Sequence, residues 1–219
     1  MKFAFLLVFA YLVGSIPWAM IIAKAYGKDL RTIGSGNIGA TNLSRALGRR
    51  WGYVCFLLDC LKGFVPVAAV SILMGQRTDS PLLFGILLGA GIAAILGHIF
   101  PVYISFKGGK GVATSFGVAL AIWPYYTICS LVSLLVWVIV TLIWRYISLA
   151  SIIASIVFPI TLVAAIFISP AWNISLLWPL MVTAIIIPFM VILMHRKNIQ
   201  RLLNGTENKV LTGNKKPVN

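Results

Sequence analysis

The chain has 219 residues, of which 60% are hydrophobic and only 10% are charged, and its mean hydropathy is +1.00. A soluble domain of this size cannot bury so much apolar surface, so the composition excludes a soluble globular protein and indicates an integral membrane protein. The 18 Lys and Arg residues against 4 Asp and Glu give a net charge of +14, which in a membrane protein is typical of cytoplasmic loops rather than of nucleic-acid binding.

The first predicted transmembrane helix covers residues 3–23. Its apolar run is longer than the central region of a secretion signal, and no small-residue cleavage site follows it, so we expect it to remain as a span. A bilayer core needs about 20 apolar residues per helix. Five further segments satisfy this requirement, namely residues 52–75, 82–106, 125–144, 147–169 and 174–194.

A seventh segment, residues 112–123, is short for a span and runs into the next helix through Trp123 and Pro124. Proline ends helices and tryptophan favours the headgroup level, which predicts an interfacial turn. If this segment is a span, 15 of the 18 Lys and Arg residues lie on one side of the membrane. Only Lys2 and Arg77 then lie on the other side, and Lys62 lies within a span.

Fusing residues 112–144 into one helix would place the basic C-terminal residues opposite those of the first loop, against the positive-inside rule. We therefore predict an all-α polytopic membrane protein with seven transmembrane helices. Its N-terminus is expected outside and its C-terminus in the cytoplasm.

The first predicted cytoplasmic loop carries the most informative motif, G-S-G-N-I-G-A-T-N-L-S-R at residues 34–45. Its glycines have the spacing G-x-G-x-x-G, but no buried strand precedes them, so we reject a dinucleotide fingerprint. Closely spaced glycines let backbone N–H groups converge on an anion, and a helix beginning at Thr41 or Asn42 would add its positive end. Arg45 shares that helix face and suits a two-pronged phosphate contact. The alternative is a flexible polar loop whose charges only set topology.

A second glycine-rich turn, K-G-G-K-G-V-A-T at residues 107–114, lies on the same predicted side. It resembles a phosphate cradle, although Gly111 follows Lys110 where a Walker P-loop has Ser or Thr. A tight hairpin with two anchoring lysines is the alternative. The last span leads into a third stretch, H-R-K-N-I-Q-R-L-L-N-G-T-E at residues 195–207, in which His195 and Asn198 are helical neighbours. Here the alternative is an interfacial histidine and a tail that binds anionic headgroups.

Three ionisable residues, Asp59, Lys62 and His98, lie within predicted spans. Such groups are hypotheses for function by default, because leaving them unpaired in a membrane is costly. Asp59 and Lys62 are three residues apart and can pair on one helix face, so a buried structural pair beside a hydrogen-bonded histidine is the alternative. The cysteines at positions 55, 60 and 129 lie in apolar stretches and are expected to be small core residues. We expect no metal.

Taken together and in this order, the three motifs resemble those of the bacterial acyl-phosphate:glycerol-3-phosphate acyltransferase family of phospholipid synthesis. The resemblance runs from the first span to about Lys209. It implies transfer of a fatty acyl group from acyl phosphate to the 1-hydroxyl of glycerol 3-phosphate, giving lysophosphatidic acid and phosphate. Acyl-CoA and acyl carrier protein are not direct donors in this family.

The resemblance also implies a site. Its implied catalytic residues are Ser35, Arg45, Lys110, His195 and Asn198. Its implied substrate- and phosphate-binding residues are Gly34, Gly36, Asn37, Gly39, Thr41, Asn42, Lys107, Gly108, Gly109, Gly111, Thr114 and Glu207. Asp59, Lys62 and His98 are expected to be intramembrane polar support for this site.

These expectations place the protein in the bacterial cytoplasmic (inner) membrane, with its active site facing the cytoplasm. Residues 1–209 are expected to form a single transmembrane acyltransferase domain, followed by a polar basic tail at 210–219. The expected partners are the two substrates and membrane lipids, with no cofactor, no nucleic acid and no obligate protein partner. The rival function is a membrane transporter of a phosphate-bearing anion, which would predict discontinuous midplane helices, repeat symmetry and polar groups along a path through the bilayer. A purely structural scaffold would not explain three glycine- and amide-rich stretches on one side.

The predicted topology can be tested by labelling. A cysteine introduced at Thr78 should react with an impermeant reagent in intact cells, whereas one at Thr212 should react only after permeabilisation. The reverse pattern would contradict the predicted orientation.

Overall fold

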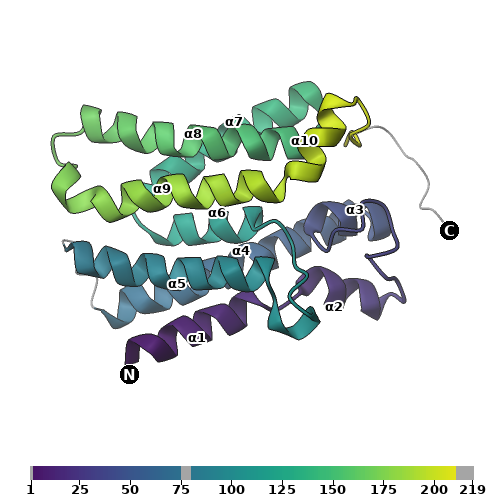
Figure 1. Ribbon diagram of the computed structural model, residues 1–219, viewed down its shortest axis with the longest axis horizontal. Helices are drawn as coiled ribbons and strands as arrows, with labels where there is room; N and C mark the ends of the chain where they lie inside the picture. The colour runs from purple at the N-terminus through teal and green to yellow at the C-terminus, as the bar shows by residue number, and fades with distance from the viewer. Residues whose placement is uncertain (1, 75–79, 211–219) are drawn as a thin grey trace. The chain divides into compact units, whose positions relative to one another are not determined.

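The computed structural model describes residues 2–74 and 80–210 (Figure 1). Arg77, Thr78, Thr212 and nearly all of the predicted tail lie outside these ranges. Within them every regular element is helical, in the order α1 (Lys2–Gly14), α2 (Trp18–Ala25), α3 (Ala40–Leu47), α4 (Arg49–Leu73), α5 (Pro81–Ile99), η1 (Val102–Ile104), α6 (Val112–Ala121), α7 (Tyr125–Trp144), α8 (Ile147–Ile168), α9 (Ile174–Met194) and α10 (Arg196–Leu203).

In the described part of the chain, six helical segments are long and apolar enough to cross a membrane. They coincide with the six long predicted spans, so the all-helical membrane fold is confirmed. The short seventh segment forms α6, which has 10 residues. At a rise of ~1.5 Å per residue it extends about 15 Å, half of a typical hydrocarbon core. Seven spans and their orientation therefore stay predictions.

The first predicted span is one apolar segment but not one helix. It runs over Phe3–Ala25 and is interrupted where α1 ends at Gly14 and α2 begins at Trp18. Pro17 has no N–H with which to continue the helix. The hydroxyl of Ser15 donates to the Tyr11 carbonyl (2.8 Å), and the carbonyl of Ile16 is left available to a side chain from elsewhere.

The chain divides into two compact units. Among the described residues, the first unit comprises 2–69 and 89–118, and the second comprises 70–74, 80–88 and 119–210. Helices α4, α5 and α6 each contribute residues to both units. All three cysteines are buried and free of disulfides, as their apolar surroundings predict.

In the first unit, glycines let α1 approach α5. A Cβ on Gly14 would collide with the carbonyl of Ala94, and a Cβ on Gly97 would collide with the carbonyl of Tyr11. Small residues are enriched at such membrane crossings because close backbone approach gains dispersion contacts where lipid removes most of the hydrophobic drive.

The same reciprocal arrangement joins α4 to α6 within this unit. A Cβ on Gly63 would collide with the carbonyl of Thr114, and a Cβ on Gly117 would collide with the carbonyl of Cys60. The beginning of α6 is therefore fixed on the middle of α4, and with it the end of the loop that precedes α6.

In the second unit, α7, α8 and α9 pack in chain order, and α10 contacts α8 and α9 (Figure 1). The hydroxyl of Tyr126 on α7 donates to the carbonyl of Leu180 on α9 and lies 2.7 Å from the hydroxyl of Thr183. The same ring meets Phe158 of α8 edge-on, with centroids 5.0 Å apart. One buried tyrosine thus connects all three long helices of this unit.

We expect Gly117→Ala to destabilise the protein, because its new methyl group would meet α4 backbone that cannot move aside. Overpacking of this kind costs roughly 1–3 kcal/mol. Thermal unfolding in detergent should show a lower midpoint. Gly85→Ala is the matched control: it is also helical but has nothing within 4 Å of the new methyl, so its midpoint should stay or rise.

Candidate active site

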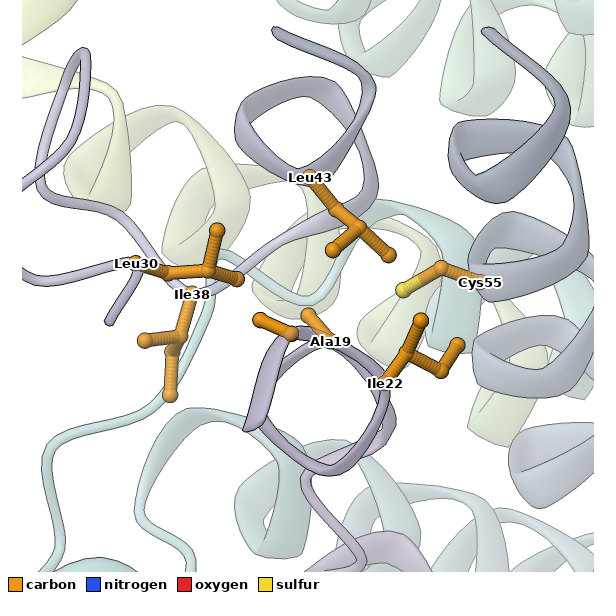
Figure 2. Packing of buried hydrophobic residues seen from close by; sticks show 7 residues of the cluster. Ala19, Ile22, Leu30, Ile38, Leu43 and Cys55 are labelled. Carbon is orange, nitrogen blue, oxygen red and sulfur yellow. The ribbon is translucent and has the colours of Figure 1, made fainter. Parts of the chain in front are cut away.

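The first glycine-rich loop is anchored by buried apolar side chains (Figure 2). They come from α2, from α3, from α4 and from the loop itself, and those labelled in the figure are Ala19, Ile22, Leu43, Cys55, Leu30 and Ile38. Leu30 is 1% exposed and Leu43 is fully buried. The loop is therefore held at two points on α2, which disfavours the alternative of a flexible polar loop.

Asn42 organises the backbone of this loop. Its side-chain amide donates to the carbonyls of Leu30 (3.0 Å) and Ile33 (3.0 Å), and its Oδ1 accepts from the backbone N–H of Ser35 (3.1 Å). The residue is only 1% exposed. Asn42 is predicted to bind phosphate, but its observed hydrogen bonds go to the backbone of the loop. Asn42 therefore supports the position of Ser35.

Glycines are required where the loop turns beside Asn42. Gly34 and Gly36 have φ values of +59° and +68°, in the left-handed region that other residues rarely adopt. A Cβ on Gly34 would meet Asn42 Oδ1 and would lie 3.8 Å from Cδ of Arg45. The stem of Arg45 therefore lies over the turn that presents the exposed Ser35.

Helix α3 begins at Ala40, one residue before the predicted start, with Gly39 as its N-cap. Gly39 offers no side chain to cap the first turn, so the positive end of the helix faces the loop without a capping side chain of that residue. Asn37 and Thr41 flank this point and are half-buried. Ser35, Arg45 and the start of α3 thus lie around one turn, where the motif predicts an anion site.

The second glycine-rich loop folds back on the end of α5. The N–H of Gly108 donates to the carbonyl of Ile99 (3.0 Å), and the N–H of Gly109 donates to that of His98 (3.1 Å). These bonds satisfy carbonyls that a helix end leaves unpaired. Gly108 and Gly109 therefore serve close approach rather than direct contact with an anion. Lys110 is half-buried and lies just before the start of α6, and its side chain is the group of this loop that suits contact with an anion.

Lys107 and Thr114 lie at opposite ends of this loop. Lys107 is exposed, whereas Thr114 is buried on α6, and Gly111 between them has a φ of +85°. This places Lys107 at the surface and Thr114 in the packing of α6 on α4, where its carbonyl faces Gly63.

The predicted pairing of Asp59 with Lys62 is confirmed. Lys62 Nζ lies 2.8 Å from Asp59 Oδ1 and also donates to the carbonyl of Ile16 (2.8 Å), at the break between α1 and α2. His98 Nδ1 lies 3.7 Å from the same Asp59 oxygen. The three side chains are 3–7% exposed. Spacing along α4 predicts the ion pair, but the approach of His98 from α5 could not be read from the sequence.

In the second unit, His195 and Asn198 stand where α9 gives way to α10. His195 Nδ1 lies 2.8 Å from the carbonyl of Val191, which can only accept, so Nδ1 carries a proton. Asn198 Nδ2 donates to Glu207 Oε1 (2.9 Å), and Arg201 Nε donates to Glu207 Oε2 (2.7 Å). Glu207 therefore holds two side chains of α10, and Arg201 is a member of this group that the sequence analysis missed.

The predicted catalytic residues thus fall into two sets. Ser35, Arg45 and Lys110 belong to the first unit, and His195 and Asn198 belong to the second. The described residues contain no group of three or more His, Cys, Asp and Glu that could hold a metal. The chemistry offered by the first set is that of hydroxyl, guanidinium, ammonium and helix N-termini, all of which favour phosphate.

Apolar helices joined by glycine-rich, basic loops define an integral membrane protein whose loop side chains suit phosphate-bearing ligands. The comparisons with known proteins make this specific. The family profile described as glycerol-3-phosphate acyltransferase matches residues 4–205, and the chain belongs to that family.

Its relatives are similar over nearly their whole length. The glycerol-3-phosphate acyltransferase of Aquifex aeolicus is 45% identical over 95% of this chain and 100% of that protein. Among solved structures, the glycerol 3-phosphate form of PlsY (YgiH), an integral membrane glycerol 3-phosphate acyltransferase, superposes with a TM-score of 0.83 at 44% identity, over 97% of both chains. A second form of it, with lysophosphatidic acid, has a TM-score of 0.80 at 43% identity over 95% of both chains.

Asn42→Asp should damage the first loop although it is nearly isosteric. It replaces a donor to two carbonyls by an oxygen that repels them, and an unsatisfied buried group costs roughly 1–3 kcal/mol. We expect a lower unfolding midpoint and a raised KM for glycerol 3-phosphate. Asn208→Asp, the same change at an exposed position, is the control and should alter neither quantity. Wild-type behaviour of Asn42→Asp would show that this amide does not support the loop.

Proposed function

We propose that this membrane acyltransferase transfers a fatty acyl group from acyl phosphate to the 1-hydroxyl of glycerol 3-phosphate, releasing lysophosphatidic acid and inorganic phosphate. The observation that carries the proposal is the arrangement of Ser35 and Arg45 around the Gly34 turn at the start of α3. The relatives support it, since PlsY is described in forms with glycerol 3-phosphate and with lysophosphatidic acid.

In this proposal the first loop holds a phosphate group. Ser35 offers a hydroxyl whose backbone position is set by Asn42, and Arg45 offers a planar fork suited to two phosphate oxygens. Lys110 offers a compact positive charge next to the start of α6. We assign Lys110 to phosphate as well, where it stabilises the charge that develops as the acyl–oxygen bond breaks.

The acyl group moves directly from donor to acceptor. The 1-hydroxyl oxygen attacks the acyl carbonyl carbon, the bond from that carbon to the phosphate oxygen breaks, and the hydroxyl proton passes to a phosphate group of the substrates. Acyl phosphate is a mixed anhydride with a good leaving group, so no enzyme nucleophile is needed. A serine nucleophile would need an adjacent base, and the side chain bonded to Ser35 is that of Asn42, an amide that cannot act as one.

His195 and Asn198 are assigned to the reaction through the family resemblance. The bond from Nδ1 to Val191 fixes the imidazole of His195, and we assign this ring to orienting a reacting group. Glu207 fixes the amide of Asn198, which suits a positioning role for that carboxylate.

We further propose that residues 1–209 act as one acyltransferase domain, because the family match crosses both units. Seven spans, an outside N-terminus and motifs facing the cytoplasm of a bacterial inner membrane complete the proposal, and the labelling of positions 78 and 212 tests its orientation.

The donor and the mechanism can be tested together on purified protein. With glycerol 3-phosphate as acceptor, acyl phosphate should support formation of lysophosphatidic acid and acyl-CoA should not. Initial-rate lines should intersect, as expected for a ternary complex. Arg45→Lys, run in the same assay, should lose about tenfold or more in kcat/KM, because a lysine lacks the two-pronged contact.

Two outcomes would contradict parts of this proposal. Acyl transfer from acyl-CoA alone would reject the donor. Intact-mass analysis after incubation with acyl phosphate alone should show no adduct, so an acyl group on Ser35 that leaves when glycerol 3-phosphate is added would replace direct transfer by an acyl-enzyme.

A further inference from the structure

We propose that His98 is a positioning residue for the second glycine-rich loop: its imidazole, packed beside the Asp59–Lys62 ion pair, sets the place of Gly109 and hence of Lys110. The inference rests on the proposed function, in which Lys110 binds phosphate. It assigns a role to a buried group that the transfer reaction itself does not use.

The first step is the contact between the ring and the turn. A Cβ on Gly109 would collide with His98 Nε2 and would lie 2.9 Å from Cε1 and 3.2 Å from Cδ2. The N–H of Gly109 also donates to the carbonyl of His98 (3.1 Å). Gly109 thus rests on the edge of the imidazole while bonding to the same residue's backbone, and Lys110 is the next residue along the chain.

The second step is what holds the ring. His98 Nδ1 lies 3.7 Å from Asp59 Oδ1, and that oxygen lies 2.8 Å from Lys62 Nζ, which donates to the carbonyl of Ile16. A buried charge deprived of its partner is strongly unfavourable, so Asp59 and Lys62 hold each other in place. His98 Nδ1 makes no hydrogen bond within the described parts of the chain, and the imidazole is held by packing between this ion pair and Gly109.

The third step connects the two loops of the unit. A cavity of about 10 Å³, close to the space one water needs, is lined by Asp59, Lys62 and His98 together with Ile38 and Gly109. Ile38 belongs to the first glycine-rich loop and Gly109 to the second. The three ionisable residues consequently face the point where both loops approach each other, which is where a support for a two-loop phosphate site has to act.

A double-mutant cycle tests the contact. Gly109→Ala should lower kcat/KM for glycerol 3-phosphate by about tenfold or more, in the range that a small misplacement costs. His98→Ala removes the ring atoms that the new methyl group meets. The kcat/KM of the double variant should therefore be at least about threefold higher than the product of the two single losses predicts, as for coupled neighbours.

Gly108→Ala is the matched control. Its methyl group would meet the backbone carbonyls of His98 and Ile99 and the ring of Pro101, none of which is removed by His98→Ala. Gly108→Ala and His98→Ala should therefore combine multiplicatively, within about twofold, as uncoupled changes do. Multiplicative effects for Gly109→Ala and His98→Ala as well, or a Gly109→Ala variant with wild-type kinetics, would overturn the proposal.

A binding measurement separates this proposal from the proposed function and from simple unfolding. Protection of the purified variants against thermal unfolding by inorganic phosphate requires no turnover, and it should show the same coupling between positions 98 and 109. An inactive wild type in the acyl-phosphate assay would reject the proposed function. The coupling measured by phosphate protection would still show whether His98 positions Gly109. If His98→Ala does not fold, the milder His98→Asn replaces it in the same cycle, with the same expected result and the same overturning one.

Discussion

A charged amine buried among apolar helices must find partners within the protein, and Lys62 does so in a way that organises the first unit. Its partners are the carboxylate of Asp59, one helical turn away, and the carbonyl of Ile16. That carbonyl is available because Pro17 interrupts the first span. The Ile16 carbonyl also accepts from the backbone N–H of Trp18 (3.1 Å), so it has a partner without Lys62. The ammonium depends on the break more than the break depends on the ammonium, because without the break α4 would carry a poorly compensated charge.

Glycine serves two different physical purposes in the two loops. In the first loop, Gly34 and Gly36 provide left-handed backbone around Ser35. In the second, Gly108 and Gly109 allow a turn to lie directly on the end of α5, with their N–H groups used up by its carbonyls. A motif that looks like a phosphate cradle is here mainly a device for close packing, and it leaves recognition of the anion to side chains.

Hydropathy and helix periodicity predicted the long helices and the Asp59–Lys62 pair, because both depend on neighbours along one helix. What escaped prediction depends on contacts across the chain. The role of Asn42 follows from carbonyls 9 and 12 residues away. His98 reaches Asp59 from another helix, and Arg201 shares Glu207 with Asn198 only because the chain turns after α10. The break before Trp18 had a signal in Pro17, but apolar continuity across residues 3–23 hid it.

The proposed transfer from an already activated donor would depend mainly on positioning and on charge, since a leaving phosphate needs no enzyme nucleophile to displace it first. In the first unit, hydrogen bonds hold the backbone of both loops in place. The loop around Ser35 is bonded to Asn42, and the turn before Lys110 is bonded to α5. These internal bonds set the backbone positions of the three side chains proposed to bind phosphate, namely Ser35, Arg45 and Lys110. A site built in this way loses activity through small displacements of its supports as readily as through loss of the residues that touch phosphate.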